Sequence, residues 1–221
     1  MQRINGIEVL TTVEELVVPT QTALIVIDMQ NYAVSAQGGP ARAGEDISQL
    51  VAMTPHLQRL LQSAREAGVL VTYAEHIMQN SLGANLSAAP MLYQLQLRPV
   101  RYVTHVVEGT WEAQTIDELA PQASDIIVRK ATAHGGSALY KTILDDVFRL
   151  RDIRSVIVAG QVTDGCVLRT AVDALQHSYY PIIVRECVGS MFQKSHEAAL
   201  AWMETRFPMF DLDEVLTTWR I

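Results

Sequence analysis

The chain of 221 residues has a formal net charge of −7 and scattered basic residues, which excludes nucleic-acid binding as a leading function because phosphate contacts require grouped Lys and Arg. Its two cysteines exclude a disulfide framework, and its apolar runs are too short to span a bilayer, so we expect neither a membrane segment nor export. We therefore expect a single cytoplasmic domain over residues 1–221.

The first half of the chain is predicted to form a strand, a helix and a second strand. The apolar run ALIVID at residues 23–28 is rich in β-branched side chains and predicts a buried strand that ends at a carboxylate. Apolar residues at helical spacing predict a helix over residues 46–67, which Gly68 ends, and VLVTYA at residues 69–74 predicts the next strand. Residues 77–110 show no sustained period, and we interpret them as an excursion over the active face.

The second half continues this alternation. Its strands are predicted at residues 125–130, 155–160 and 181–185, and its helices at 110–120, 139–150, 167–177 and 196–204, before a short tail. Strands that alternate with helices imply right-handed crossovers. The chain is therefore predicted to have an α/β fold, a three-layer α/β/α sandwich around a mostly parallel, doubly wound sheet.

Three side chains with reactive chemistry follow strands of this sheet. Asp28 closes the first strand, Lys130 closes the third, and Cys166 lies beyond the fourth, where a helix begins. Ligands of open parallel sheets bind beyond the carboxyl ends of the strands. Taken singly, the cysteine could be a small buried hydrophobe, the aspartate a helix cap and the lysine a solvated cation. Together at one sheet edge they indicate a nucleophilic site.

The chemistry of Cys166 depends on its thiolate, and two features are expected to lower the pKa of the thiol. The following helix would direct its N–H groups at the sulfur, and Lys130 would supply a positive charge. Asp28 would take the thiol proton and pass it to a departing amine. Cleavage of an amide is the expected reaction.

The turn GQVTDGC at residues 160–166 is expected to hold the oxygen that becomes negative in the tetrahedral intermediate. The backbone N–H groups of Val162 and Cys166 are the predicted donors. Gly160 and Gly165 would permit the close approach and the unusual torsions of such a turn.

These residues resemble the isochorismatase-like cysteine hydrolases, a family that includes nicotinamidases and hydrolases of ureidoacrylate, biuret and N-carbamoylsarcosine. The resemblance rests on Asp28 in ALIVIDMQN, Lys130 in DIIVRK and Cys166 in VIVAGQVTDGCVLRTAVDA, and it covers roughly residues 20–205. It implies an Asp–Lys–Cys triad, a covalent acyl- or carbamoyl-enzyme intermediate, release of ammonia and no organic cofactor. It also implies a homo-oligomer, a dimer or a tetramer.

The resemblance further implies a cis peptide bond between Gln161 and Val162, with both residues at the substrate. Departures from the family favour its amidase branch, since isochorismatases lack the nucleophilic cysteine that this chain keeps. The metal-binding Asp-x-His stretch of nicotinamidases is absent after Asp28, and His76 lies outside any such stretch, so no metal is expected. The loop at residues 131–138 is long compared with these relatives and would reshape the pocket.

Several other side chains are candidates for substrate contacts, each with a plain structural alternative. Gln30, Asn31 and Tyr32 follow the first strand and could present amide and hydroxyl groups, or they could only build a turn. Trp111 could form a wall of the pocket or pack in the core. His134 could donate to a substrate carbonyl, or it could be solvated.

Four residues near strand ends or on the last helix are expected to stay outside the chemistry. Cys187 lacks a following helix and glycine turn, so we interpret it as structural. His196 is expected on a packed or surface face, and Met191 and Phe192 in the core or an interface rather than in the pocket.

The predicted partner is a small molecule, a linear amide or a ureide. Two enzymatic alternatives are a nicotinamide-type amidase and an ether hydrolase of the isochorismatase type. A third alternative is a non-catalytic α/β module that binds a small molecule. It is disfavoured because the chain has neither a G-x-G-x-x-G nor a G-x-x-x-x-G-K-[ST] phosphate loop.

Overall fold

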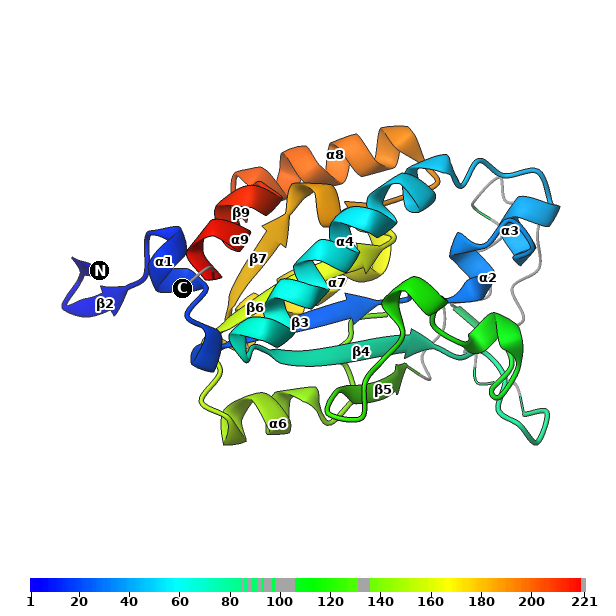
Figure 1. The fold of residues 1–221 in the computed structure, drawn as a ribbon, viewed down its shortest axis with the longest axis horizontal. Helices are drawn as coiled ribbons and strands as arrows, with labels where there is room; N and C mark the ends of the chain where they lie inside the picture. Colours follow the sequence, from blue (N-terminus) through cyan, green and yellow to red (C-terminus); the bar gives the residue numbers. More distant parts are fainter. Residues whose placement is uncertain are drawn as a thin grey trace.

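A computed structural model describes residues 1–84, 86, 89, 90, 93, 97, 106–130 and 136–219. A sheet lies at its centre, with helices on both faces (Figure 1). Across this sheet the strands come in the order β5 (Ile126–Lys130), β4 (Leu70–His76), β3 (Thr22–Ile27), β6 (Ser155–Gln161), β7 (Tyr180–Val184) and β9 (Met209–Phe210), and β8 (Val188–Gly189) also pairs with β6. The described strands of this sheet pair in parallel.

The helices form two outer layers. One face of the sheet is covered by α4 (Ser48–Ala67) and α9 (Leu212–Trp219), and the other by α6 (Leu144–Leu150), α7 (Leu168–Gln176) and α8 (Gln193–Glu204). Alternate residues of β3 enter different cores, because Leu24 faces the α4 side and Ile25 faces α6 and α7. The predicted three-layer α/β/α sandwich is therefore confirmed.

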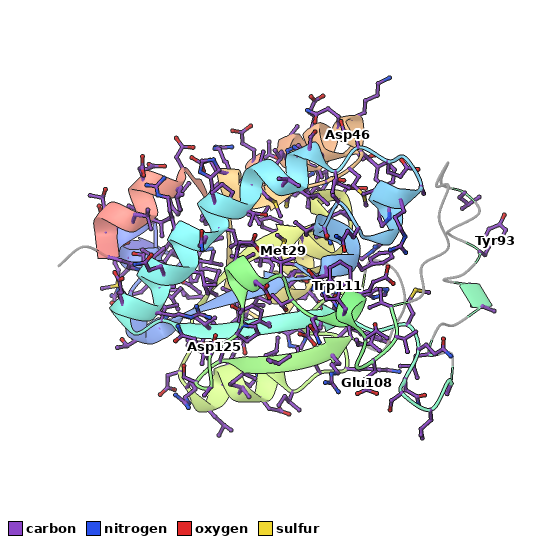
Figure 2. All side chains as sticks on the ribbon, turned by 45° about the vertical axis from the view of Figure 1, so that its right-hand side comes forward. Met29, Asp46, Tyr93, Glu108, Trp111 and Asp125 are labelled. Atoms are coloured by element: carbon purple, nitrogen blue, oxygen red, sulfur yellow. The ribbon has the colours of Figure 1, made fainter. Side chains whose placement is uncertain are left out.

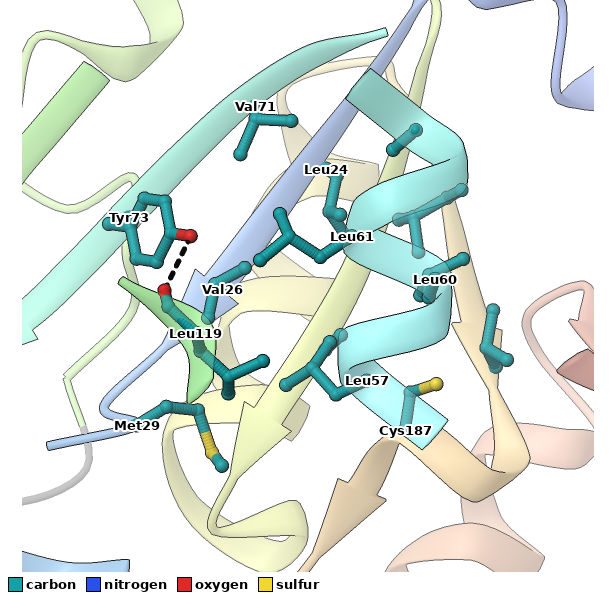
Figure 3. Packing of buried hydrophobic residues seen from close by; sticks show 14 of the residues in the cluster. Leu24, Val26, Met29, Leu57, Leu60, Leu61, Val71, Tyr73, Leu119 and Cys187 are labelled. Atoms are coloured by element: carbon teal, nitrogen blue, oxygen red, sulfur yellow. Dashed lines mark hydrogen bonds between the residues drawn. The ribbon is translucent and has the colours of Figure 1, made fainter. Parts of the chain in front are cut away.

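The long helix α4 carries the apolar stripe that the sequence predicted. Its Leu57 and Leu61 are buried against Leu24 and Val26 of β3, as Figure 3 shows. Full burial of one such side chain contributes roughly 1.5–3 kcal/mol, so the stripe holds the helix on the sheet. The helix ends at Gly68, whose φ of +80° is the left-handed conformation typical of a glycine that ends a helix.

Shorter elements lie at the two ends of the sheet (Figure 1). The helices α2 (Asn31–Val34) and α3 (Gly39–Arg42) lie beyond the carboxyl ends of the strands. At the opposite end, β1 (Gln2–Ile4) and β2 (Ile7–Val9) form an antiparallel hairpin, followed by α1 (Val13–Leu16). In the part of the chain that the structure describes, no helix is long and apolar enough to cross a membrane.

The prediction of a helix at residues 110–120 is wrong. Two 3-10 turns, η2 (Trp111–Ala113) and η3 (Asp117–Leu119), lie there instead. Between them, Thr115 forms a β-bridge with Gln30 in the segment that follows β3. This pairing holds the backbone extended, and such a tertiary contact overrides a weak helical preference.

The largest of the other differences from the prediction concern two helix starts and the C-terminal tail. The helix expected at residues 139–150 begins only at Leu144, and the last predicted helix begins earlier than expected, at Gln193. The expected tail is instead the helix α9, whose Trp219 donates its indole N–H to the carbonyl oxygen of Val17 at 2.7 Å.

The direction in which strands are added reverses between β3 and β6, which is where a doubly wound sheet binds its ligands. Gly160 of β6 lies there opposite Ile27, with a φ of +112°. A Cβ atom on Gly160 would lie 2.2 Å from the carbonyl oxygen of Ile27. Only glycine allows the two strands to approach this closely, so it brings together the segments that carry Asp28 and Cys166.

Replacing Gly160 with alanine should therefore destabilise the protein by several kcal/mol or prevent its folding, because the added methyl group collides with a neighbouring backbone. Gly68→Ala is the matched control, since its φ is also positive but nothing lies within 4 Å of its added Cβ. The control should lower the free energy of unfolding by about 1–2 kcal/mol. Urea denaturation measures both losses, and equal losses would contradict the role of the close approach.

Candidate active site

A buried ion pair joins two strands that are not neighbours in the sheet. The ammonium of Lys130, at the end of β5, lies 2.6 Å from Oδ2 of Asp28, which directly follows β3. The Lys130 side chain is 0 % exposed and that of Asp28 is 10 % exposed. The same ammonium donates to the carbonyl oxygen of Gly136 at 3.3 Å. Because charges this far from water are costly unless paired, each group offsets part of the cost of burying the other.

The backbone around Asp28 directs its carboxylate toward Lys130. Asp28 has a φ of +52°, in the left-handed region that residues other than glycine seldom adopt. Its N–H donates to the carbonyl oxygen of Ala74 at 3.0 Å, and its carbonyl oxygen accepts a bond from the side-chain amide of Gln161 at 2.6 Å. Gln161, which was expected at the substrate, thus holds the backbone of Asp28 in place.

Cys166 lies in a π-helical turn, Thr163–Val167, that continues into α7. The turn follows a cis peptide bond between Gln161 and Val162, as the family resemblance implied. The carbonyl oxygen of Val162 accepts the N–H of Gly165 at 2.9 Å, which closes the start of the turn. Turns of this kind are rare and occur frequently at functional sites.

The thiol of Cys166 and the ammonium of Lys130 shift one another's pKa. Burial, the largest cause, and the Asp28 carboxylate raise the pKa of the thiol, and the Lys130 ammonium lowers it, so that the net value is about 12. The expectation that Lys130 and the start of a helix leave this thiol with a lowered pKa is therefore wrong for the resting site. Burial lowers the pKa of Lys130, but Asp28 and Cys166 outweigh burial and raise it above its usual value. The resting site holds a thiol beside a charged pair.

The two oxygens of the Asp28 carboxylate differ in their surroundings. Oδ2 accepts a hydrogen bond from Lys130, whereas Oδ1 is buried and has no hydrogen-bond partner among the described residues. A buried acceptor without a donor is costly and commonly indicates a functional role. Oδ1 is therefore an acceptor that remains available to a further donor.

Gln30 and Asn31 bind loop backbone. The side-chain nitrogen of Gln30 donates to the carbonyl oxygens of His76 at 3.1 Å and of Ala113 at 2.7 Å, and its oxygen accepts the His76 amide at 2.8 Å. The side-chain nitrogen of Asn31 donates to the carbonyl oxygen of Trp111 at 3.1 Å. These bonds favour the turn-building alternative for both residues.

Tyr32 and Trp111 differ in exposure. Tyr32 is buried against Gly39, where a Cβ would lie 2.7 Å from the tyrosine ring, and this favours a packing role. Trp111 is 44 % exposed (Figure 2) and, with Asn31, lines a cavity of about 430 Å³ beside α4. His134, the remaining candidate for a substrate contact, lies outside the described residues.

Cys187 has the surroundings of a structural cysteine. It is fully buried among the apolar side chains under α4 (Figure 3), and burial raises the pKa of its thiol. Met191 packs partly buried against the same core, and Phe192 is also partly buried. Within the described ranges, no three His, Cys, Asp or Glu side chains are grouped so that they could hold a metal ion.

The structure adds two polar residues beside the nucleophile that sequence reasoning did not assign there. His196 is buried, as the packed alternative predicted for it. Its ring binds the hydroxyl of Thr163 in the π-helical turn. Ser190 binds Asp164 in the same turn. Neither residue belongs to a motif around Cys166, so no local pattern could have identified it.

The chain is similar to known proteins in both sequence and fold. A model of the isochorismatase domain family matches residues 22–211. The ureidoacrylate amidohydrolase RutB of Acinetobacter baylyi is 30 % identical over 197 residues, which cover 86 % of this chain and 79 % of the relative. Its counterpart from Agrobacterium fabrum is 32 % identical over 176 residues, which cover 76 % and 75 %. The solved structure of a cysteine hydrolase from Pseudomonas syringae pv. phaseolicola matches with a TM-score of 0.76 at 25 % identity, over 91 % of this chain and 93 % of that one.

The raised pKa of the Cys166 thiol predicts how it reacts with iodoacetamide. Alkylation should keep accelerating between about pH 7 and about pH 11, whereas the rate of an ordinary thiol with a pKa of about 8.5 levels off above about pH 9.5. Asp28→Asn removes a charge that raises this pKa, so the variant should react faster at neutral pH. Mass spectrometry of the Cys166 peptide measures the rate, with buried Cys187 as the internal reference. A plateau by about pH 9.5, or a slower variant, would contradict the assignment.

Proposed function

This chain belongs to the isochorismatase domain family and is an amidohydrolase, a hydrolase of carbon–nitrogen bonds, and on that premise we propose that it cleaves a small linear amide or ureide through Cys166. The observation that carries the proposal is the buried Lys130–Asp28 ion pair, both members of which act on the pKa of the Cys166 thiol. A nucleophile, a proton acceptor and a fixed positive charge are the groups that acyl transfer to sulfur requires.

In the first half of the reaction, the sulfur of Cys166 bonds to the substrate carbonyl carbon while its proton passes to Oδ1 of Asp28. The carbonyl electron pair moves onto oxygen, and the amides of Val162 and Cys166 are our candidates for binding that oxyanion. Asp28 then gives the proton to the leaving nitrogen, the carbon–nitrogen bond breaks and ammonia departs. An amide leaves a thioester on Cys166, and a ureide leaves a thiocarbamate.

In the second half, Asp28 takes a proton from water, and the water oxygen bonds to the acyl carbon. The carbon–sulfur bond then breaks, the sulfur recovers its proton from Asp28, and the acid product leaves. The carboxylate thus acts as a base and as an acid in each half of the cycle.

Lys130 makes this cycle compatible with a thiol of raised pKa. The thiol keeps its proton until a substrate is present, and its negative charge develops only as the carbonyl carbon is attacked. At that moment the ammonium of Lys130 stabilises the charge without reorganising, because the ion pair already fixes its position.

We further propose that the protein works in the cytoplasm as a dimer or a tetramer, without a metal or an organic cofactor. The two described cysteines are free and buried, which is compatible with a reducing compartment. The family resemblance supports the oligomer.

Removing the nucleophile should abolish turnover and leave the fold intact. We expect no detectable ammonia release from Cys166→Ala or Cys166→Ser, with circular dichroism unchanged. Cys187→Ala, which removes the other thiol from the apolar core, is the matched control and should stay active. With the wild type, mass spectrometry during turnover should find an acyl or carbamoyl adduct on the Cys166 peptide. Full activity of Cys166→Ala, or an adduct confined to Cys187, would overturn the assignment.

Substrate preference should follow the relatives that are named for a ureide. Ammonia release from a panel of linear ureides, simple aliphatic amides and nicotinamide is expected to be fastest with a ureide. Fastest release from nicotinamide would favour a nicotinamidase-type enzyme. No release from any compound, with hydrolysis of a vinyl ether instead, would favour an isochorismatase-type enzyme.

A further inference from the structure

The π-helical turn that carries Cys166 is held by side chains that take no part in the reaction described above. Thr163 and Asp164 precede the nucleophile, and each binds a residue from a later segment of the chain. A π-helical turn is rare because an α-helical turn is ordinarily preferred. Contacts from outside the turn are therefore expected to maintain its shape.

The first contact joins α8 to the start of the turn. Nδ1 of His196 lies 2.8 Å from Oγ of Thr163, and the exposed fractions of the two residues are 7 % and 0 %. Burial lowers the pKa of His196, so the ring is neutral near pH 7. A neutral imidazole has one donor and one acceptor nitrogen. It can therefore pair with the hydroxyl without bringing a charge next to the nucleophile.

The second contact comes from the segment between β8 and α8. Oγ of Ser190, a residue that is 1 % exposed, donates to Oδ1 of Asp164 at 2.7 Å. Ser190 directly follows β8, which pairs with Gly160 and Gln161 at the end of β6. This one segment thus binds the chain on both sides of the Gln161–Val162 peptide.

A third pair of bonds holds the other end of the turn. The hydroxyl of Thr170, on α7, donates to the carbonyl oxygen of Cys166 at 2.7 Å. The same hydroxyl accepts the backbone N–H of Ala138 at 2.9 Å. The turn is thus held by side-chain hydrogen bonds at both of its ends.

We propose that His196 and Ser190 are positioning residues of the reaction, an inference that rests on the proposed role of Cys166. His196 acts through Thr163, and Ser190 acts through Asp164. Together they prevent the turn from relaxing to an α-helical one, which would rotate its side chains about the helix axis and move the sulfur away from the ion pair. A misplacement of about 1 Å in a reacting group can reduce a rate about 100-fold.

Thr163→Val tests the proposal because valine has nearly the shape of threonine but carries a methyl group in place of the hydroxyl. Thr163→Ser restores that hydroxyl and is the rescue variant. Thr72→Val is the matched control, since Thr72 is also 0 % exposed and its hydroxyl binds the carbonyl oxygen of Leu24 at 3.1 Å, in the middle of β4. For each variant, kcat, KM, the melting temperature and the rate of Cys166 alkylation are measured.

The proposal predicts a loss in kcat that the control does not share. Thr163→Val should lower kcat about 100-fold with little change in KM, and it should alter the alkylation rate of Cys166. Thr163→Ser should recover most of the activity, and Thr72→Val should lose a similar amount of thermal stability while keeping its kcat. Should Thr163→Val fail to fold, Ser190→Ala removes the second contact and takes its place. A kcat for the test variant as high as that of Thr72→Val would overturn the proposal.

The alkylation rate separates this proposal from the proposed function. If the wild type hydrolyses no compound of the panel, the proposed function fails, but the reactivity of Cys166 still reports its position. An alkylation rate in Thr163→Val equal to those of the wild type and Thr72→Val would then contradict positioning on its own. A changed rate would support it.

Discussion

The chemistry of this site depends on two opposite charges that are held together away from water. A buried carboxylate or ammonium is costly by several kcal/mol when alone, and the attraction between the two offsets that cost only at close range and in good geometry. Lys130 and Asp28 meet this condition at 2.6 Å, and the side chain of Gln161 binds the Asp28 backbone so that the geometry is kept. In the proposed mechanism, a base and a fixed positive charge are therefore both present before any substrate arrives. The thiol beside them can stay protonated, and therefore unreactive, until a substrate binds.

The sheet explains how residues 102 positions apart in the chain come to share one site. Asp28 follows β3 and Cys166 follows β6, which are adjacent strands at the point where the direction of strand addition reverses. Lys130 ends β5, two strands away from β3, and its long side chain reaches past β4 to the carboxylate. Such a crevice exists in any doubly wound sheet, so the fold alone would not reveal the function. In the proposed function, the chemistry comes from the three side chains placed there.

Most of the architecture could be predicted from the sequence because its signals are local. The apolar run before Asp28 is enough to predict a strand, and the apolar stripe before Gly68 is enough to predict a helix. The helix prediction at residues 110–120 failed because this segment pairs with Gln30, which lies far away in the chain. The same limit applies to the site. The three reactive residue types could be identified by their positions at strand ends, whereas the raised pKa of the Cys166 thiol follows from burial by segments that no local pattern brings together. The contact between His196 and Thr163 is likewise a product of tertiary structure.

The central claim is that the sulfur of Cys166, the ammonium of Lys130 and the carboxylate of Asp28 form one cluster. A crystal structure of the unmodified protein measures it most directly, through the distances from the sulfur to Nζ of Lys130 and to Oδ1 of Asp28. The account predicts that both atoms lie within about 6 Å of the sulfur, close enough to shift the pKa of the thiol, while the ammonium remains bound to Oδ2. A sulfur more than about 6 Å from either group, or an ammonium turned away from the carboxylate, would contradict it.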